Sequence, residues 1–344
     1  MKIQHIYWFA YFSIDEPSVR YRGKYALNLW QAQYGISSSF VYPSYKWRNI
    51  LHFLRVYFEA LCWRKKDSII VFENIYTHRI YTFALKLLLF WQKKHSLYDI
   101  DDADYTRFPP DVIHHFMRNC EACSVGSQGI LEYTKAFNSQ VFLLTSPVIA
   151  HNFVKGKRNS LFTIGWIGYY SAHKESLKTL FFPALLDIDF PVKLVLLGVA
   201  ERYRNEVITF FSANKNIFLE MPKNIDWLAE TAIYAQIQQF DVGISPLLKT
   251  EFNIAKSAFK QKQCLSCGVP VLATPLGENI RFLEAGKNGY FCENPADFQT
   301  GILRLKNMTE EEYQLLSQHA RKSFETFSMA HYCETLIDFY KKIE

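Results

Sequence analysis

The chain alternates between short apolar runs and longer stretches whose apolar residues recur at helical spacing. In the first half, the apolar runs predict strands near 3–10, 38–42, 68–72, 96–100, 122–126 and 141–144. The stretches between them predict helices near 18–34, 48–63, 78–93, 109–119 and 128–136. Because strands that alternate with helices are typical of parallel sheets, this order predicts an α/β fold.

The second half repeats this alternation after a polar segment. Residues 146–160 are rich in polar, glycine and lysine residues, which predicts an interdomain linker. Strands are then expected near 161–167, 192–197, 216–219, 240–245, 269–273 and 289–292, with amphipathic helices near 309–324 and 329–342. A chain of 344 residues is long for a single core, so we expect two domains.

One run, Phe240 to Phe291, predicts a βαβ unit with polar residues at the ends of its strands. It contains an apolar strand that ends at Pro246, a helix over 254–267 and a buried strand over 269–273. Open α/β sheets bind ligands at the carboxyl ends of their strands, so the run predicts where a ligand would bind.

The predicted helix over 254–267 carries a polar stripe. Its members are Lys256, Lys260, Gln263 and Cys267. Their spacings of four, three and four residues would place them on one face. Two lysines near the helix start oppose the helix dipole, and a bound anion would offset that repulsion. A solvent-exposed polar face has the same spacing, so the pattern alone leaves both interpretations open.

The Phe240–Phe291 run resembles the donor-binding half of the retaining glycosyltransferases of family 4. The resemblance rests on Pro246, Lys256, Lys260, Cys267–Thr274 (CGVPVLAT), Gly277 and Ala285–Cys292 (AGKNGYFC). Upstream, Thr163–Leu177 and Val192–Gly198 resemble the first two strands of the family's C-terminal domain. More loosely, Ser18–Ile36 and Ser96–Ala103 resemble parts of its N-terminal domain.

This resemblance implies the GT-B fold, which has two facing Rossmann-like domains and a central interdomain cleft. Residues 1–152 would bind the acceptor, residues 153–325 would bind the nucleotide sugar, and residues 326–344 would form a helix that returns to the N-terminal domain. The implied reaction moves a sugar from a nucleotide diphosphate sugar, such as a UDP- or GDP-sugar, to a saccharide or lipid-linked saccharide. The anomeric configuration would be retained, and the setting would be bacterial surface polysaccharide or glycan assembly.

The resemblance also assigns roles to single residues. Lys256 and Lys260 would stabilise the charge on the leaving diphosphate, and Gln263 would bind the ribose. Gly168 and Gly277 would let the backbone approach the phosphates. With the two lysines neutralising the diphosphate, no metal and no cofactor are expected.

Further binding candidates flank the two glycine turns and the first strand. His173 and Lys174 are the nearest cations to the place where the family usually has an arginine. Glu278 and Asn279 would meet the pyrophosphate or the sugar, although helix capping explains them equally well. Arg20 follows the first strand and would bind a phosphate, although an exposed helix arginine is the plainer interpretation.

The sequence departs from the family at its usual pair of glutamates, which are separated by seven residues. The matching positions hold Ala255 and Gln263. Two alternatives therefore accompany the transferase interpretation: a nucleotide-sugar epimerase of the same fold, and a non-catalytic nucleotide-sugar-binding protein.

Four aspartates cluster at the end of the strand near 96–100. They are Asp99, Asp101, Asp102 and Asp104. Asp-x-Asp pairs hold Mg²⁺ or Mn²⁺ in glycosyltransferases of the other large fold, GT-A. In the GT-B interpretation, Asp102 would face the cleft as a general base for the acceptor hydroxyl. Turn formation by aspartate explains the cluster without any chemistry.

Two cysteine pairs have the CxxC spacing of zinc sites, Cys120/Cys123 and Cys264/Cys267. Each lies in a predicted helix that leads into a buried strand, so we interpret them as core thiols. The odd total of seven cysteines and the lack of a signal peptide favour a reducing cytoplasm.

The net charge of +6 is concentrated in part of the chain, and nothing in its pattern suggests a nucleic-acid partner. Residues 47–66 contain five lysines and arginines and one acidic residue, with apolar residues at helical spacing and tryptophans near both ends. This predicts a helix that contacts the inner membrane surface peripherally. A core-packed helix with a basic outer face is the alternative. Residues 80–91 are apolar but too few to span a bilayer.

Overall fold

The computed structural model describes residues 3–77, 79–149 and 151–343, which form two compact units. Unit 1 contains residues 1–149, 254–257 and 327–344, and unit 2 contains residues 150–253 and 258–326. The sequence assigned residues 254–257 to the second domain. In the structure Ala255 packs against Gly129 of unit 1, so close that a Cβ on Gly129 would lie 3.2 Å from the Ala255 Cα.

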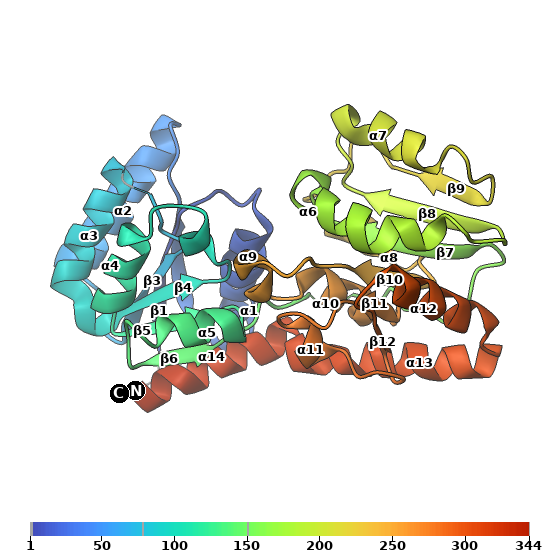
Figure 1. Ribbon diagram of the computed structural model, residues 1–344. Coiled ribbons are helices and arrows are strands. Elements are labelled where there is room, and N and C mark those ends of the chain that lie inside the picture. Colours follow the sequence, from blue (N-terminus) through green and yellow to red (C-terminus); the bar gives the residue numbers. More distant parts are fainter. Residues whose placement is uncertain (1–2, 78, 150, 344) are drawn as a thin grey trace. The chain divides into compact units, whose positions relative to one another are not determined.

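Unit 1 is built on a parallel six-stranded sheet in the order β2-β1-β3-β4-β5-β6 (Figure 1). The strands are β1 (His5–Ala10), β2 (Ser37–Val41), β3 (Ser68–Glu73), β4 (Ser96–Ile100), β5 (Ala122–Val125) and β6 (Val141–Leu143). The helices are α1 (Tyr25–Tyr34), α2 (Trp47–Cys62), α3 (Ile80–Gln92), α4 (Asp111–Asn119), α5 (Gln128–Thr134) and α14 (Met329–Ile343). A π-helical segment, Val19–Lys24, precedes α1.

Unit 2 has a second parallel six-stranded sheet, in the order β12-β11-β10-β7-β8-β9. The strands are β7 (Phe162–Ile167), β8 (Val192–Leu197), β9 (Ile217–Glu220), β10 (Val242–Ser245), β11 (Val271–Ala273) and β12 (Gly289–Phe291). The helices are α6 (Tyr170–Ser176), α7 (Glu201–Phe211), α8 (Glu230–Ile237), α9 (Glu251–Ile254, whose last residue belongs to unit 1), α10 (Phe259–Ser266), α11 (Asn279–Phe282), α12 (Pro295–Asn307) and α13 (Glu310–Ser323).

The predicted α/β class and parallel sheets are confirmed, and every predicted strand is present. The central strands are buried along their whole length, β1 with the sequence HIYWFA and β7 with FTIGWI. Helices that cover both faces of a parallel sheet require such continuous apolar runs. Two glycines let neighbouring elements approach the unit 2 sheet. A Cβ on Gly165 would clash with the Phe240 ring, and one on Gly243 would clash with Cys264 of α10.

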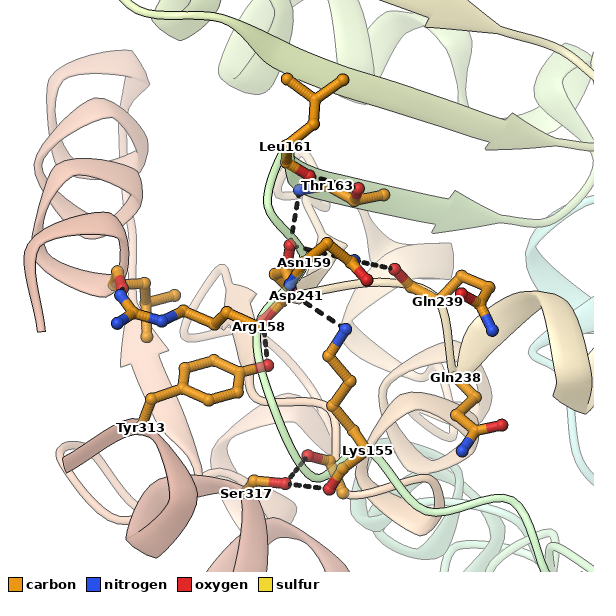
Figure 2. Close-up of polar contacts among 12 residues, drawn as sticks. Lys155, Arg158, Asn159, Leu161, Thr163, Gln238, Gln239, Asp241, Tyr313 and Ser317 are labelled. Carbon is orange, nitrogen blue, oxygen red and sulfur yellow. Dashed lines mark hydrogen bonds and ion pairs between the residues drawn. The ribbon is translucent and has the colours of Figure 1, made fainter. Parts of the chain in front are cut away.

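A buried carboxylate, Asp241, joins the segment before β7 to the start of β10 (Figure 2). Its Oδ1 lies 2.8 Å from Lys155 Nζ, and the side chains of Asp241 and Lys155 are 0% and 4% exposed. The same carboxylate accepts hydrogen bonds from the backbone N–H groups of Asn159 at 2.9 Å and Thr163 at 2.7 Å. The Tyr313 hydroxyl donates to the Asp241 carbonyl at 2.8 Å. One side chain therefore fixes how β7 and β10 begin.

Replacing Asp241 with asparagine should destabilise the protein strongly, because it leaves the Lys155 ammonium buried without its counter-charge. We expect a loss of about 3–5 kcal/mol in the free energy of unfolding, measured by urea denaturation. The control is Glu220→Gln, which breaks a more exposed ion pair with Lys193 in the same unit and should cost about 1 kcal/mol or less. Equal losses in both variants would contradict the structural role of Asp241.

Candidate functional site

The strand order of unit 2 reverses at β7, which lies between β8 and β10. In open parallel sheets, ligands bind at the carboxyl ends of the strands beside such a reversal. Gly168 follows β7 with φ +149°, and Gly198 follows β8 with φ +109°. Both angles disfavour residues with a Cβ, and a Cβ on Gly198 would lie 2.0 Å from the Gly168 carbonyl oxygen. The two loops are therefore packed backbone against backbone.

Lys260 of α10 lies directly against this glycine loop. A Cβ on Gly168 would be 2.4 Å from the Lys260 Cε, so the lysine chain occupies the space that a larger residue would need. The Lys260 ammonium donates a hydrogen bond to Nε2 of His173 at 2.9 Å, which requires a neutral imidazole protonated on Nδ1. The structure therefore brings together three of the predicted residues: Gly168, His173 and Lys260.

The predicted helix over 254–267 is wrong at its start. Helix α10 begins at Phe259, because Ala258 adopts a left-handed conformation with φ +54° that ends regular helical geometry on its N-terminal side. Lys256 therefore lies outside the helix and shares no helix face with Lys260. Gln263 and Cys267 are buried at 6% and 0% exposure, so the predicted polar stripe does not form.

Lys256 instead belongs to unit 1, where its ammonium lies 2.9 Å from Oδ1 of Asp102. The two side chains are 20% and 38% exposed. Asp102 follows β4, so the pair lies near the carboxyl end of a strand of the unit 1 sheet.

The neighbouring aspartates of this strand end differ in their surroundings. Asp99 is buried and forms two hydrogen bonds with the buried Arg22 guanidinium, at 2.8 and 2.5 Å. Burial and the charge of Asp102 raise the pKa of Asp101 to about 6. Burial and the charges of Asp102 and Asp101 raise the pKa of Asp104 to about 7. A pKa near neutrality suits a general acid or base. Asp104 is therefore a second candidate for the general base, beside Asp102, and the sequence did not single it out.

The turn after β11 serves chiefly to hold strand ends together. The Asn279 side-chain amide donates to the carbonyls of Ser245 at 3.3 Å and Thr274 at 3.1 Å, which joins the carboxyl ends of β10 and β11. Glu278 is 3% exposed at its side chain and lies 3.4 Å from the Arg281 guanidinium. Gly277 begins the turn with φ +56°. Binding by these residues stays a prediction.

Two cations predicted to take part in binding, Lys174 and Arg20, contact other protein groups. Lys174 lies 3.9 Å from a Glu175 carboxylate oxygen and 5.5 Å from the centre of the Tyr203 ring. In unit 1, Arg20 is only 3% exposed and donates to the carbonyls of Ile14 and Asp15 at 2.9 and 2.7 Å. Its guanidinium therefore holds the loop after β1, contrary to the interpretation of an exposed arginine.

A pocket of about 330 Å³ opens beside the glycine loops of unit 2. Tyr169 and Trp227 line it, with ring centres 5.9 Å apart, together with Gly198 and the charged Arg204 and Lys223. A Cβ on Gly198 would contact Gly168 on one side and the Trp227 ring on the other. The pocket therefore adjoins the two glycine loops, and Lys260 packs against the loop that contains Gly168.

The aspartate cluster and the two CxxC pairs are the places where the sequence raised the question of metal ligation. Within residues 3–77, 79–149 and 151–343, no group of three or more histidine, cysteine, aspartate or glutamate side chains could hold a metal ion. The cysteines of both CxxC pairs are buried as free thiols, as expected for core residues. Burial raises the pKa of all four thiols, which favours the neutral form over the thiolate that binds metals.

No family model and no curated protein matches the chain, but solved structures do. A glycosyltransferase from Rickettsia africae ESF-5 matches over 100% of this chain and 99% of its own, with a TM-score of 0.68 and 11% identity. HepE of Anabaena in complex with UDP-glucose matches over 98% and 99%, with a TM-score of 0.68 and 13% identity.

Sucrose-phosphate synthase from Thermosynechococcus elongatus matches over 99% of both chains, with a TM-score of 0.68 and 11% identity. At such low identities this likeness shows the fold alone. The protein has the GT-B fold of these glycosyltransferases, as the sequence predicted.

The raised pKa of Asp104 predicts a pH-dependent stability. From about pH 4 to 7 the folded state holds a proton that the unfolded state has lost, so stability falls as the pH rises through this range. The wild type should lose free energy of unfolding as the pH rises from about 5 to 8. In Asp104→Asn this loss should be smaller by about 1–2 kcal/mol, measured by urea denaturation. The exposed Asp189→Asn should follow the wild type. An unchanged pH dependence in Asp104→Asn would contradict the environment described here.

Proposed function

We propose that the protein transfers a sugar from a nucleotide diphosphate sugar to a saccharide or lipid-linked saccharide, with retention of the anomeric configuration. The observation that carries this proposal is the arrangement in unit 2 of an aromatic pocket beside two glycine loops, with a lysine packed against one of these loops. A nucleotide diphosphate has the same order of parts, with a flat base at one end and a double negative charge at the other.

The base would bind in the pocket lined by Tyr169 and Trp227. Its volume of about 330 Å³ suits part of a nucleotide, and its rings offer apolar faces to a flat base. Stacking of a base on an aromatic side chain contributes roughly 1–3 kcal/mol. HepE of Anabaena was solved with UDP-glucose, so a UDP-sugar is the first donor to test.

The diphosphate would lie over Gly168 and Gly198, within reach of Lys260. Backbone without side chains lets phosphate oxygens approach closely, and the lysine ammonium would neutralise the charge that develops on the leaving diphosphate. Lys260 now donates to the neutral His173, and a phosphate oxygen would be a stronger acceptor for the same ammonium. Neither a metal nor another cofactor is part of this proposal.

The acceptor would be bound by unit 1, with Asp102 or Asp104 as the group that takes the hydroxyl proton. Lys256 would keep its ion pair with Asp102 and so position that carboxylate. A lipid-linked acceptor of surface polysaccharide assembly would place the reaction in the cytoplasm at the inner membrane face, with residues 47–66 in contact with the membrane. Within the described residues, no helix is long and apolar enough to cross a membrane.

One observation favours a second candidate, a binding protein without turnover. The position where the resembled family usually has a glutamate holds Ala255, which is 2% exposed. An alanine offers no functional group to the donor sugar. Such a protein would bind the donor but transfer no sugar to any acceptor.

Donor binding is tested first by thermal shift with UDP, GDP, ADP, CMP and their sugar conjugates, without metal. One diphosphate class should raise the stability by about 2.7 kcal/mol at a hundred times its dissociation constant. Trp227→Ala and Lys260→Met should each weaken binding at least about tenfold, because they remove the base contact and the phosphate charge. The control is Lys215→Met, an exposed lysine of the same unit, which should bind as the wild type does.

The outcomes separate the candidates. Binding that survives both substitutions would contradict the proposed site, and the absence of binding by any nucleotide would contradict the proposed donor class. Radiolabelled sugar transferred to a saccharide acceptor supports the transferase, whereas tight binding without transfer supports the binding protein.

A further inference from the structure

Helices α2 and α3 of unit 1 expose an unusual number of large apolar side chains. These are Trp47, Ile50, Leu51, Leu54 and Phe58 on α2, and Ile80, Phe83, Leu87, Phe90 and Trp91 on α3, with exposures of 38–91%. The two helices contact each other and lie at the outer left edge of Figure 1. We define these ten side chains as the α2–α3 surface.

The exposed residues form one stripe on each helix. At 100° per residue, Trp47, Leu54 and Phe58 lie on the side of α2 opposite Val56 and Ala60, which are buried. In α3, Ile80 and Leu87 likewise lie opposite the buried Leu89. Each helix thus has an apolar side towards the core and a second one towards solvent. The solvent side of α2 therefore carries large apolar side chains as well as the exposed Arg48 and Arg55.

Basic residues lie along α2 and next to the ends of both helices. Exposed lysines and arginines nearby are Lys46, Arg48, Arg55, Lys65, Lys66, Arg79, Lys93 and Lys94. Residues 43–95 contain ten lysines and arginines and three acidic residues, so this stretch carries a formal charge of +7, against +6 for the whole chain. A second copy of the same surface would meet like charge, whereas an anionic partner would be attracted.

We infer that the α2–α3 surface binds an anionic lipid bilayer. Tryptophan and phenylalanine side chains enter the boundary between head groups and acyl chains, and surrounding lysines and arginines bind lipid phosphates. The contact is larger than the 47–66 segment expected from the sequence, because α3 supplies half of the apolar side chains. It does not depend on the proposed reaction.

Sedimentation with vesicles tests this inference. The wild type should bind vesicles that contain phosphatidylglycerol, bind phosphatidylcholine vesicles far more weakly, and lose affinity as salt is added. Phe83→Ser/Phe90→Ser removes two rings that are 73% and 75% exposed, so the fold should tolerate it. Its vesicle affinity should fall at least about tenfold. The matched control is Leu315→Ser, which changes a 57% exposed side chain of unit 2 and should leave binding unchanged.

Equal binding to both kinds of vesicle, no binding to either, or full binding by the double variant would overturn the inference. So would a wild-type dimer that the double variant converts to a monomer in light scattering, since the surface would then bind a second copy. Nucleotide binding by the double variant should match the wild type, so a failure of the membrane inference can be distinguished from a failure of the proposed function.

Discussion

The buried ion pair between Asp241 and Lys155 sets the frame on which the candidate site of unit 2 depends. Asp241 lies at the start of β10, and its carboxylate binds the backbone just before β7, so the two strands that flank the reversal of strand order are joined at their amino ends. At their carboxyl ends, Asn279 joins β10 to β11. A site formed by loops at one edge of a sheet is only as well defined as the register of the strands beneath it.

The candidate site also depends on two residues without side chains, Gly168 and Gly198. The carbonyl of Gly168 lies where a Cβ of Gly198 would be, and the lysine chain of α10 lies where a Cβ of Gly168 would be. The same close packing brings Trp227 against Gly198, which joins the aromatic pocket to the lysine. Replacing either glycine would therefore disturb the packing between the two loops, with Trp227 displaced in one case and Lys260 in the other.

Much of this fold was predictable, because buried parallel strands are continuous apolar runs and each predicted strand is present. The start of α10 was not predictable, because helical spacing continues through Ala258 and an alanine gives no sequence signal for a left-handed conformation. Trp227 was missed because it lies in an irregular segment without periodicity. The arginine–aspartate pair Arg22 and Asp99 was also hidden, since residues 77 positions apart meet only in the folded sheet. The outward stripe of α2 shows that helical spacing identifies an apolar face but not the side that it faces.

The most direct test of the central claim is a crystal structure with UDP bound. The account predicts the uracil ring in the pocket that Tyr169 and Trp227 line, and a diphosphate oxygen within about 3 Å of Lys260 Nζ, above Gly168. A diphosphate bound away from Lys260, or a base outside the aromatic pocket, would contradict it.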